Sequence, residues 1–598
     1  MLKPIKSKSM RKLVYAFVII GGAAFTSCTL PKMVKMAKDQ NLTVTPNPLE
    51  VHKDTVNYEV AANLPVKMLK KGTSYTLNTF YKYGDNELAL EPIPFKAEDY
   101  PNSKTEAPRV TKSFSFPYQP AYKTGVLQVE GVAAKGAKSK KSPRLDVATG
   151  IITTSKLVQN SYYAAFADHG YNNQEEIVPV VIPDFYFEQG KSVLRTTETK
   201  SEKGKQLDAF IAAKNATRTV TITGTHSPEG RERVNSKLSE ERALAIKKYY
   251  VAQMKKYDYK GLADSIKFIE KPIVDDWTGF KDALSAYEGI TADEKAAYLN
   301  VVNSPSSFEE QEKQLKKLPG YKKVFKEVYP KLRTAKTEIL TIKEKKTDAE
   351  ISVLAKQITQ GASSETLSFE ELMYAASLTP SLDEKAAIYE AATKKGSNWN
   401  AHNNLGATYI AQAIENPARA SELADKASAQ LEIAAKIKET PEVNANLASV
   451  ALWKGNPYKA YSYAGKALNG ASNDVARGVN GVKGASEIYQ AKYADAVRTE
   501  SSAATTPVNL FNKGLAQLLN KDYANASSSF AEATRANSNY AIAYYGAAVA
   551  AARSGNADGV ISNLTSAVKI DASLKEKALT DLEFSKQATN DAFRNALK

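Results

Sequence analysis

The sequence predicts a multidomain protein in which an N-terminal β-sandwich precedes a central α/β domain with a helical insertion and a C-terminal α-helical solenoid. Three observations predict this order. Up to about residue 176, short segments alternate apolar and polar residues between turn signals, as sandwich strands do. From residue 177, strand patterns alternate with helical ones. From residue 347, an alanine-rich stretch repeats its helical contact residues, which predicts a solenoid.

The first 27 residues have the plan of a secretory signal peptide. A basic stretch ending in Lys12 is followed by the apolar run "LVYAFVIIGGAAF", which is shorter than the roughly 20 residues that span a bilayer. Residues 25–28, Phe-Thr-Ser-Cys, resemble the bacterial lipobox, whose cysteine is acylated and becomes the new N-terminus. The resemblance implies a lipid such as palmitate on Cys28, followed by a linker over 28–41. The alternative is an ordinary signal peptide with an incidental thiol.

The sequence is moderately basic. Its 81 Lys and Arg residues exceed the 65 Asp and Glu residues, which gives a formal net charge of +16. A surface of this charge suits nucleic acid, anionic lipid or an acidic polymer. Because the sequence has no basic-aromatic stripe and no nucleic-acid motif, we expect no nucleic-acid partner. Cys28 is the single cysteine, so the exported part has no disulfides and each domain depends on its own core.

Residues 42–176 predict the β-sandwich. The stretches "LTVTPNPLEVHKDTVNYEV", "SYTLNTFYKYG" and "GVLQVEGVAA" alternate apolar with polar residues and are rich in β-branched and aromatic side chains. The basic run "KGAKSKKSPR" at 135–144 is interpreted as a solvated hairpin or loop, with contact to a lipid or a glycan as the minority alternative. No residue of this domain suggests chemistry, so we expect a binding or spacer module.

Residues 177–346 predict an α/β domain. The stretches "VVIPDFYFEQG", "RTVTITG" and "SIKFIEK" predict strands, and a helix that crosses between neighbouring strands indicates a βαβ arrangement. Ser227, Pro228 and Glu229 predict the start of the helix after the second strand, because they supply a capping oxygen, a proline and an acid. The residues of this helix expected to lie on the sheet are Val234, Leu238, Ala245 and Tyr249.

The same region carries a family resemblance. The following residues reproduce in order and spacing the signature of the OmpA C-terminal-like domain, a peptidoglycan-binding module of bacterial envelopes: Gly224, Gly230, Asn235, Leu238-Ser239 and Arg242-Ala243. Phe187, Gly190 and Leu194 fit the opening of that domain. The stretches "IVDDWTGF" and "YPKLR" resemble the enlarged version in Bacteroidota, which implies a helical insertion at about 276–328. The resemblance covers residues 177–346.

The resemblance implies a ligand site on this helix. In the family, an arginine and a preceding aspartate hold the diaminopimelate of a peptidoglycan stem peptide. Arg242 matches the arginine, and Asn235 belongs to the same signature. Ser227 occupies the aspartate position, so a charge-assisted hydrogen bond of about 1.5–3 kcal/mol is missing unless Glu229 supplies the carboxylate. The alternative is that Arg242 pairs with a neighbouring acid and the pocket is vestigial.

Residues 347–598 predict tetratricopeptide (TPR) repeats. Three contact residues recur after 34 positions, with Ala526, Phe530 and Ala533 followed by Val560, Leu564 and Ala567. Looser copies predict about six helix pairs from near residue 365 to residue 570, capped by the helix that ends in "DAFRNALK". Such an array presents a concave surface that usually binds peptides or partner proteins. A spacer or stabilising array is the alternative.

Nothing in the sequence predicts an enzyme. The four histidines, His52, His169, His226 and His402, are scattered, and there is no nucleophile elbow, phosphate loop or cluster of metal ligands. We therefore expect no catalytic residue, no metal and no cofactor.

Two functions remain. The first is a periplasm-facing outer-membrane lipoprotein that associates with peptidoglycan and scaffolds a cell-envelope assembly, recruiting outer-membrane or periplasmic proteins through its TPR array. The second is a pure interaction scaffold of an outer-membrane complex, whose OmpA-like domain no longer binds peptidoglycan. A Glu229 carboxylate within reach of Arg242 would favour the first, and an Arg242 buried in a salt bridge would favour the second. The stretch "TLPKMVKMAKDQ" after Cys28 lacks the early acidic run associated with surface-exported lipoproteins of Bacteroidota, which favours the periplasmic face.

Overall fold

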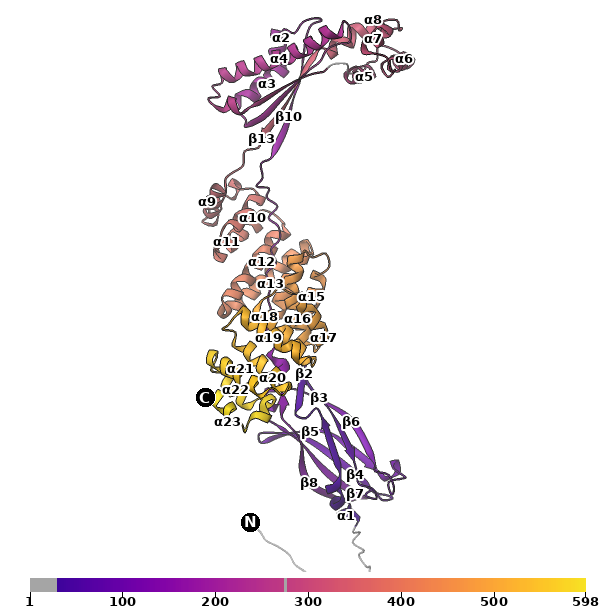
Figure 1. Cartoon of the computed structure of the whole chain (residues 1–598), viewed down its shortest axis with the longest axis vertical. Helices are drawn as coiled ribbons and strands as arrows, with labels where there is room; N and C mark the ends of the chain where they lie inside the picture. The colour runs from indigo at the N-terminus through magenta and orange to yellow at the C-terminus, as the bar shows by residue number, and fades with distance from the viewer. Residues whose placement is uncertain (1–28, 274–276) are drawn as a thin grey trace, which may run out of the picture. The chain divides into compact units, whose positions relative to one another are not determined.

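The computed structural model describes residues 29–273 and 277–598, and it divides into two compact units. One unit combines the chain up to Gly170 with Ser352–Lys598, and the other is Tyr171–Ile351 (Figure 1). The sequence predicts three successive domains. In the structure, the β-sandwich and the solenoid instead belong to one unit, and the α/β domain is inserted between them in the chain.

The N-terminal β-rich region is a sandwich of two sheets. The five-stranded sheet has the order β1-β3-β2-β9 with β6 also paired to β3, and the four-stranded sheet has the order β5-β4-β7-β8. The strands are β1 (Asn41–Thr45), β2 (Leu49–His52), β3 (Thr55–Asn63), β4 (Ser74–Tyr83), β5 (Asn86–Lys96), β6 (Arg109–Pro117), β7 (Val126–Lys135), β8 (Lys138–Thr149) and β9 (Ile151–Ile152). Val60 and Phe116 of the first sheet share one core with Leu77 and Leu127 of the second. This packing confirms the alternation seen in the sequence.

The segment that follows residue 28 is a packed helix. The helices α1 (Thr29–Met36) and η1 (Ala37–Asp39) bury Leu30, Met33 and Ala37 in the sandwich core. These residues are spaced three and four positions apart, so they share one helical face. The predicted linker over 28–41 is therefore wrong for residues 29–39, because burying this apolar face against the sandwich is favourable. Cys28 and the predicted signal peptide 1–27 lie outside the described residues.

The sandwich ends earlier than its predicted boundary at residue 176. Its last strand ends at Ile152, and η4 (Thr154–Leu157) follows. Residues 158–169 then have no regular secondary structure, and Val158 and Ala165 belong to the hydrophobic core of the solenoid. We call residues 158–169 the resident segment. Its sequence "VQNSYYAAFADH" has the aromatic texture of a strand, but it packs against helices.

The second unit is built on a four-stranded sheet of order β10-β13-β11-β12. Its elements are β10 (Ile177–Tyr186), α2 (Thr196–Thr199), α3 (Glu202–Ala212), β11 (Thr217–Gly224), α4 (Glu232–Lys256), η5 (Leu262–Ser265), β12 (Lys267–Pro272) and β13 (Thr334–Ile342). The strands β11 and β12 pair in parallel across α4, as the βαβ pattern predicts, and β13 lies antiparallel between β10 and β11. Leu207, Val220, Ile246 and Ile339 are among the residues of its core.

The packed face of α4 agrees only in part with the predicted one, because Ala245 and Tyr249 pack against the core whereas Val234 does not. Its buried residues are Asn235, Ser239, Arg242, Ala243, Ile246, Tyr250 and Met254. Val234, predicted to lie on the sheet, is 49% exposed, and Leu238 is only partly buried. Hydrophobic periodicity is misleading here because polar residues take three of the buried positions in the first half of the helix.

The helical insertion lies between β12 and β13, as predicted. It consists of α5 (Thr278–Ser285), α6 (Ala292–Val302), α7 (Phe308–Leu315), α8 (Tyr321–Glu327) and η6 (Tyr329–Leu332). These helices have a core of their own that includes Phe280, Leu284, Tyr298 and Tyr329. The insertion is therefore a small subdomain packed on one end of the sheet rather than an extended loop.

The C-terminal region is an array of antiparallel helix pairs. Its helices are α9 (Asp348–Thr359), α10 (Phe369–Leu378), α11 (Leu382–Thr393), α12 (Trp399–Glu415), α13 (Ala420–Ile437), α14 (Pro441–Trp453), α15 (Pro457–Ala467), α16 (Asn473–Tyr489), α17 (Tyr493–Ser501), α18 (Pro507–Leu519), α19 (Tyr523–Ala536), α20 (Ala541–Arg553), α21 (Ala557–Ile570), α22 (Leu574–Thr580) and α23 (Asp591–Ala596). Six pairs run from α10 to α21 in the described chain, which confirms the expected TPR array.

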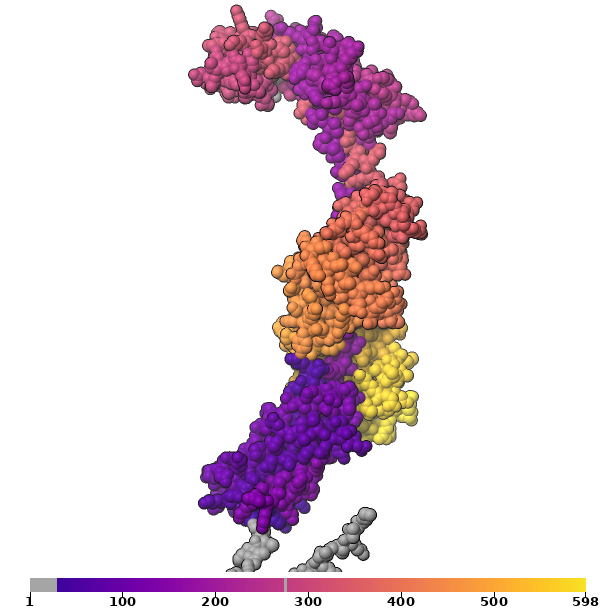
Figure 2. All heavy atoms as spheres, turned by 180° about the vertical axis from the view of Figure 1, so that it is seen from behind, coloured from indigo at the N-terminus to yellow at the C-terminus, as the bar shows by residue number. Residues whose placement is uncertain are grey.

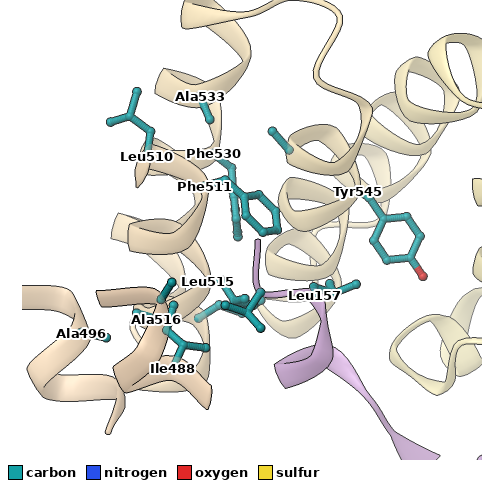
Figure 3. Packing of buried hydrophobic residues seen from close by; sticks show 14 of the residues in the cluster. Leu157, Ile488, Ala496, Leu510, Phe511, Leu515, Ala516, Phe530, Ala533 and Tyr545 are labelled. Atoms are coloured by element: carbon teal, nitrogen blue, oxygen red, sulfur yellow. The ribbon is translucent and has the colours of Figure 1, made fainter. Parts of the chain in front are cut away.

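The residues of the 34-residue repeat are core residues. Ala526, Phe530 and Ala533 of α19 are fully buried. Figure 3 shows Phe530 beside Phe511, with Ala533 on the same helix. The ring of Phe530 fits between two glycines, because a Cβ atom at Gly514 or Gly546 would lie 2.9 or 2.7 Å from it. Small residues at these positions let neighbouring helices approach closely, as the repeat pattern predicts.

Ion pairs join the sandwich to the C-terminal repeats. Arg553, at the end of α20, donates to Glu50 of β2 over 2.8 Å and to Glu583 of η9 (Leu582–Gln587) over 2.6 and 2.9 Å. Burial opposes ionisation of Glu50, but hydrogen bonds from His52 and the charge of Arg553 lower its pKa to about 2. Figure 2 shows the violet sandwich in contact with the yellow C-terminal helices.

Candidate binding sites

The loop of residues 225–231 connects β11 to α4 and carries the first part of the family signature. The helix begins at Glu232, and Arg231 occupies the N-cap position without a side-chain cap. Ser227 was expected to cap this helix, but it lies four residues before Arg231 and does not do so. Its hydroxyl instead accepts a hydrogen bond of 2.8 Å from Arg333 Nε, and it is 5% exposed. Ser227 is therefore fixed by Arg333, at the end of the helical insertion, rather than by α4.

Several signature residues serve the packing of β11 against α4. A Cβ atom at Gly224 would lie 2.0 Å from the carbonyl oxygen of Ser239, so this close approach requires glycine. Ser239 is fully buried and donates to the carbonyl of Ile273 over 3.2 Å, and Ala243 is fully buried beside it. Gly230 has a φ of +108°, which disfavours other residues. Most of these signature residues are therefore required by the close packing of β11 against α4.

Arg242 is buried and saturated by backbone carbonyls. It is 1% exposed, and it donates to the carbonyls of Thr225, Lys191 and Glu188 over 2.7, 3.1 and 3.3 Å. Its guanidinium also lies 5.5 Å from the ring centre of Phe187. Burial, followed by the nearby Arg333 charge, lowers the pKa of Arg242 to about 10. This arginine fastens two loops to the helix, and it does not form the buried salt bridge considered from the sequence.

The carboxylate of Glu229 is held by Arg333 rather than by Arg242. Arg333 Nη2 donates to Glu229 Oε1 over 2.7 Å, and both side chains are nearly buried. Within the described residues, no hydrogen bond joins Glu229 to Arg242. Sequence reasoning missed Arg333 because it lies at the end of the helical insertion, more than a hundred residues after Ser227 and Glu229 in the chain. The family motif does not indicate that Arg333, at the end of the insertion, contacts this loop.

Two buried polar atoms of the signature keep unused hydrogen-bonding capacity within the described residues. They are Glu229 Oε2 and Asn235 Nδ2. Asn235 is 3% exposed, and its side chain lies beside Gly230, where a Cβ atom would be 3.4 Å from Oδ1. The structure brings the predicted site residues close to one another; they are Ser227, Glu229, Asn235 and Arg242. Their charged groups are already bonded, because the Arg242 guanidinium donates to backbone carbonyls and the Glu229 carboxylate accepts from Arg333.

An accessible hollow lies on the other side of the 225–228 loop. Its volume is about 440 Å³, and it is bounded by β10, β13, α5 and α7. Phe280 and Phe308 supply apolar walls, and the charged lining residues are Asp184, Asp282, Lys331 and Lys336. Burial raises the pKa of Asp184, whereas the charge of Lys336 opposes that rise. This hollow offers both signs of charge to a ligand, which the buried signature residues do not.

The concave face of the solenoid is occupied by the resident segment. Side-chain amides of the first helix of three repeats bond the backbone of alternate residues, each amide accepting from an N–H and donating to the C=O of the same residue. The pairs are Asn404 with Ala167 (2.6 and 2.9 Å), Asn446 with Ala165 (2.7 and 2.8 Å) and Asn512 with Gln159 (3.0 and 2.7 Å). The hydroxyl of Ser449 bonds both groups of Tyr163 in the same way. The solenoid thus binds the resident segment as an extended chain, through hydrogen bonds to its backbone.

The side chains of the resident segment fit the groove closely. Tyr162 stacks on Trp453 with ring centres 3.8 Å apart. The ring of Tyr163 lies where a Cβ at Gly478 would be, since that atom would be 2.3 Å from it. The hydroxyl of Ser161 donates to Asn509 over 2.6 Å. The prediction of an open concave peptide-binding face is therefore corrected, because the protein's own chain fills it.

The asparagines of the groove were not found from the sequence. Asn404, Asn446 and Asn512 are separated by 42 and 66 positions, which are not multiples of the 34-residue period. A search for repeated contact residues therefore does not align them. Their shared feature is structural, because each faces the concave side from the first helix of its pair.

The described histidines and acids do not gather into a metal site. His52 bonds Tyr493 and Glu50, whereas His402 bonds Gln430, so these histidines lie in separate places. No group of three His, Cys, Asp or Glu residues among those described is arranged to hold a metal ion. No helix within residues 29–273 or 277–598 combines the length and apolarity needed to cross a membrane.

Comparison with known proteins identifies one family within the chain. Residues 186–260 match the OmpA family. No curated protein matches the sequence. Similar solved structures include part of a TPR repeat-containing protein from Cytophaga hutchinsonii (15% identity, 38% of this chain and 92% of that one, TM-score 0.28) and PilW, a type IV pilus biogenesis factor (16%, 43% and 100%, 0.26). The APC/C hetero-tetramer Cut9-Hcn1 is a third (12%, 62% and 77%, 0.31).

Proposed function

We propose that this protein is a periplasm-facing outer-membrane lipoprotein that associates with peptidoglycan and scaffolds a cell-envelope assembly. The observation that carries the proposal is the match of residues 186–260 to the OmpA family. Cys28 is the lipid attachment point in this proposal, on the strength of the lipobox-like residues 25–28. The role is one of binding and positioning, so it requires no catalytic residue, metal or cofactor.

The peptidoglycan contact is assigned to the hollow beside the 225–228 loop. Arg242 is unsuitable as a direct ligand because its donors are taken by backbone carbonyls. The end of a diaminopimelate side chain carries a carboxylate and an ammonium group. Lys331 is exposed and suits the carboxylate, whereas Asp184 suits the ammonium, whose charge would favour the ionised form of this partly buried acid. A ligand of mixed charge therefore fits the hollow.

Sedimentation with isolated sacculi tests this assignment. The chain of residues 29–598 is compared with a Lys331→Gln/Lys336→Gln variant, which removes both cations of the hollow. The matched control is Lys322→Gln/Lys326→Gln, which removes two exposed lysines of α8. We expect the wild type and the control to sediment and the hollow variant to bind at least tenfold more weakly, because charge-assisted hydrogen bonds of about 1.5–3 kcal/mol are lost. Equal sedimentation of all three would refute the assignment.

A second function, that of a pure scaffold whose OmpA-like domain no longer binds peptidoglycan, is favoured by one observation. Arg333 holds Ser227 and Glu229, the two residues that could have supplied the family's acceptor. If this function is correct, the wild type fails to sediment with sacculi, whereas the folded unit remains intact. The same experiment therefore separates the two functions.

Partner proteins are proposed to dock on surfaces of the solenoid other than its concave face. The resident segment bonds to α12, α14 and α18, so a competing peptide would have to displace backbone hydrogen bonds from three helices. The outer surfaces of the pairs are not committed in this way. Recruitment of outer-membrane or periplasmic proteins thus remains part of the proposed role without use of the groove.

A further inference from the structure

One end of the β-sandwich gathers four connecting segments. Strand register places Asn41 opposite Asn63, and Ser74 opposite both Lys96 and Ala134, so these strand ends lie together. The connections at this end are α1 with η1, the loops 64–73 and 97–108, and the turn between β7 and β8. We call these segments the basal end. The opposite end of the sandwich contacts the solenoid through Glu50.

The basal end is strongly basic. The exposed faces of α1 and η1 carry Lys32, Lys35 and Lys38, and residues 135–141 add four lysines around the β7–β8 turn. These outnumber the acids of the same segments, of which Asp39 lies on η1 and the others lie within the loop 97–108. The basic run at 135–144, for which the sequence left a lipid contact open, is thus one part of a larger cationic surface.

A shallow cavity of about 850 Å³ opens at this end. Its lining includes four lysines, one acid and apolar groups such as the ring of Tyr100. The charged residues are Lys67, Lys70, Lys71, Lys104 and Glu98. Within the described residues, none of these four lysines forms an ion pair. The two loops that bound it are tied together, since the Lys67 N–H donates to the Ser103 carbonyl over 2.6 Å and the Ala97 N–H to the Thr73 carbonyl over 3.0 Å. The lysines are therefore held on a rigid frame, which suits binding of an anionic group.

The chain leads from the predicted lipid attachment point directly into this end. Thr29, the first residue of α1, follows Cys28 after one peptide bond, which spans about 3.8 Å between Cα atoms. Because α1 is packed on the sandwich, no free linker separates that attachment point from the basal lysines. A lipid on Cys28 would bring the membrane surface close to them.

We propose that the basal end binds the anionic phosphate headgroups of the membrane that holds the lipid of Cys28. The proposal rests on the lipid attachment given under the proposed function, which locates the membrane. Lysines near an anionic lipid surface add affinity individually, and a second binding signal of this kind converts a marginal lipid anchor into a stable one. The contact would also fix the sandwich against the membrane, since α1 offers little freedom of rotation.

Binding to vesicles tests the proposal without the lipid. The unlipidated chain of residues 29–598 is mixed with vesicles of phosphatidylcholine alone or with phosphatidylglycerol added, and bound protein is measured by sedimentation. We expect binding only to the vesicles that contain phosphatidylglycerol, and we expect it to weaken as salt is added. The variant Lys67→Gln/Lys70→Gln/Lys71→Gln should bind at least tenfold more weakly. The control Lys255→Gln/Lys322→Gln/Lys326→Gln, which loses the same charge from the OmpA-like unit, should bind as the wild type does.

Each outcome decides the proposal. Equal losses in the basal and control variants would show a general effect of net charge and would overturn it. Absence of binding to anionic vesicles would also overturn it, even if Cys28 is acylated in cells. Loss of sacculus binding by the basal variant, with vesicle binding retained, would reassign the surface to peptidoglycan. Failure of the lipid attachment would appear separately, as release of the full-length protein from membranes with vesicle binding unchanged.

Discussion

Buried polar side chains in both units bond to backbone groups that are distant in the sequence. Arg242 fastens the loops at Lys191 and Thr225 to α4, and Asn446 fastens Ala165 to α14. Each such group costs free energy when it is buried and recovers it only if its partners are in place. These contacts therefore make one arrangement of loops and helices far more stable than alternatives, and they explain why polar residues occupy core positions.

A buried pair of acids in the solenoid predicts a pH dependence of stability. Glu500 of α17 lies beside Glu487 of α16, and burial, followed by the Glu487 charge, raises the pKa of Glu500 well above its usual value. The unfolded chain loses this proton first as the pH rises, so the stability associated with it is complete below about pH 4.3 and declines as the pH rises toward the folded-state pKa. The expected slope is about 1.4 kcal/mol of unfolding free energy per pH unit.

The variant Glu500→Gln checks this expectation. Glutamine cannot titrate, so the thermal unfolding midpoint of the variant should fall less between pH 5 and pH 8 than that of the wild type, and it should exceed the wild-type value at pH 8. Glu532→Gln, at an exposed position, is the control and should leave the profile unchanged. Identical profiles for wild type and Glu500→Gln would mean that Glu500 is ionised in the folded protein.

At the scale of residues, the sequence predicts positions better than roles. The spacing of the OmpA signature locates Gly224, Asn235 and Arg242 correctly beside one loop. It does not predict that Arg333 takes the neighbouring acceptor, because this contact depends on where the insertion returns to the sheet. The sequence also predicts that Ser227 caps the helix. In the structure, its hydroxyl instead accepts a hydrogen bond from Arg333. Burial and partner choice are properties of the tertiary structure.

At the scale of elements, local sequence patterns predict the helices and strands. They do not predict that the resident segment lies in the groove of the solenoid. The aromatic residues of this segment are typical of a strand, and a strand and a peptide in a TPR groove are both extended chains that bond through backbone groups. A strand and a groove-bound peptide differ in what they bond to. Here the bonding groups are asparagine side chains of the solenoid, whose spacing in the sequence does not follow the 34-residue repeat. The repeat period itself predicts the helix pairs, because Ala526, Phe530 and Ala533 must meet neighbouring helices in every copy.

Replacement of a groove asparagine should destabilise the first unit. In Asn446→Ala, the N–H of Ala165 loses its acceptor while it remains buried, and its C=O keeps only the bond from Asn403. We expect a loss of about 1–3 kcal/mol in unfolding free energy. Asn469→Ala, at an exposed position, is the matched control and should change stability little. A loss equal to that of the control, measured by denaturant unfolding, would mean that the backbone contact contributes nothing.

At the scale of the whole molecule, the β-sandwich and the TPR array form one unit although some two hundred residues separate them in the chain. Composition and periodicity predict the three kinds of fold, because each has a local signature, and the family resemblance implies the insertion at about 276–328. The sequence does not predict that the segments before and after the OmpA-like domain in the chain form one folded unit. This depends on the resident segment and on the Arg553 ion pairs. Long-range contacts of this kind have no local pattern.

Hydrogen exchange of the native protein of residues 29–598 tests occupation of the groove most directly. The N–H groups of Tyr163, Ala165 and Ala167 are bonded by side chains of α12 and α14, so they should exchange as slowly as the amides within those helices. Residues 470–472, in the loop between α15 and α16, supply the fast reference, because their N–H groups form no backbone hydrogen bond within the described chain. Slow exchange across the resident segment is the result expected here. Exchange as fast as that of the reference loop would contradict the account and would leave the groove open to other peptides.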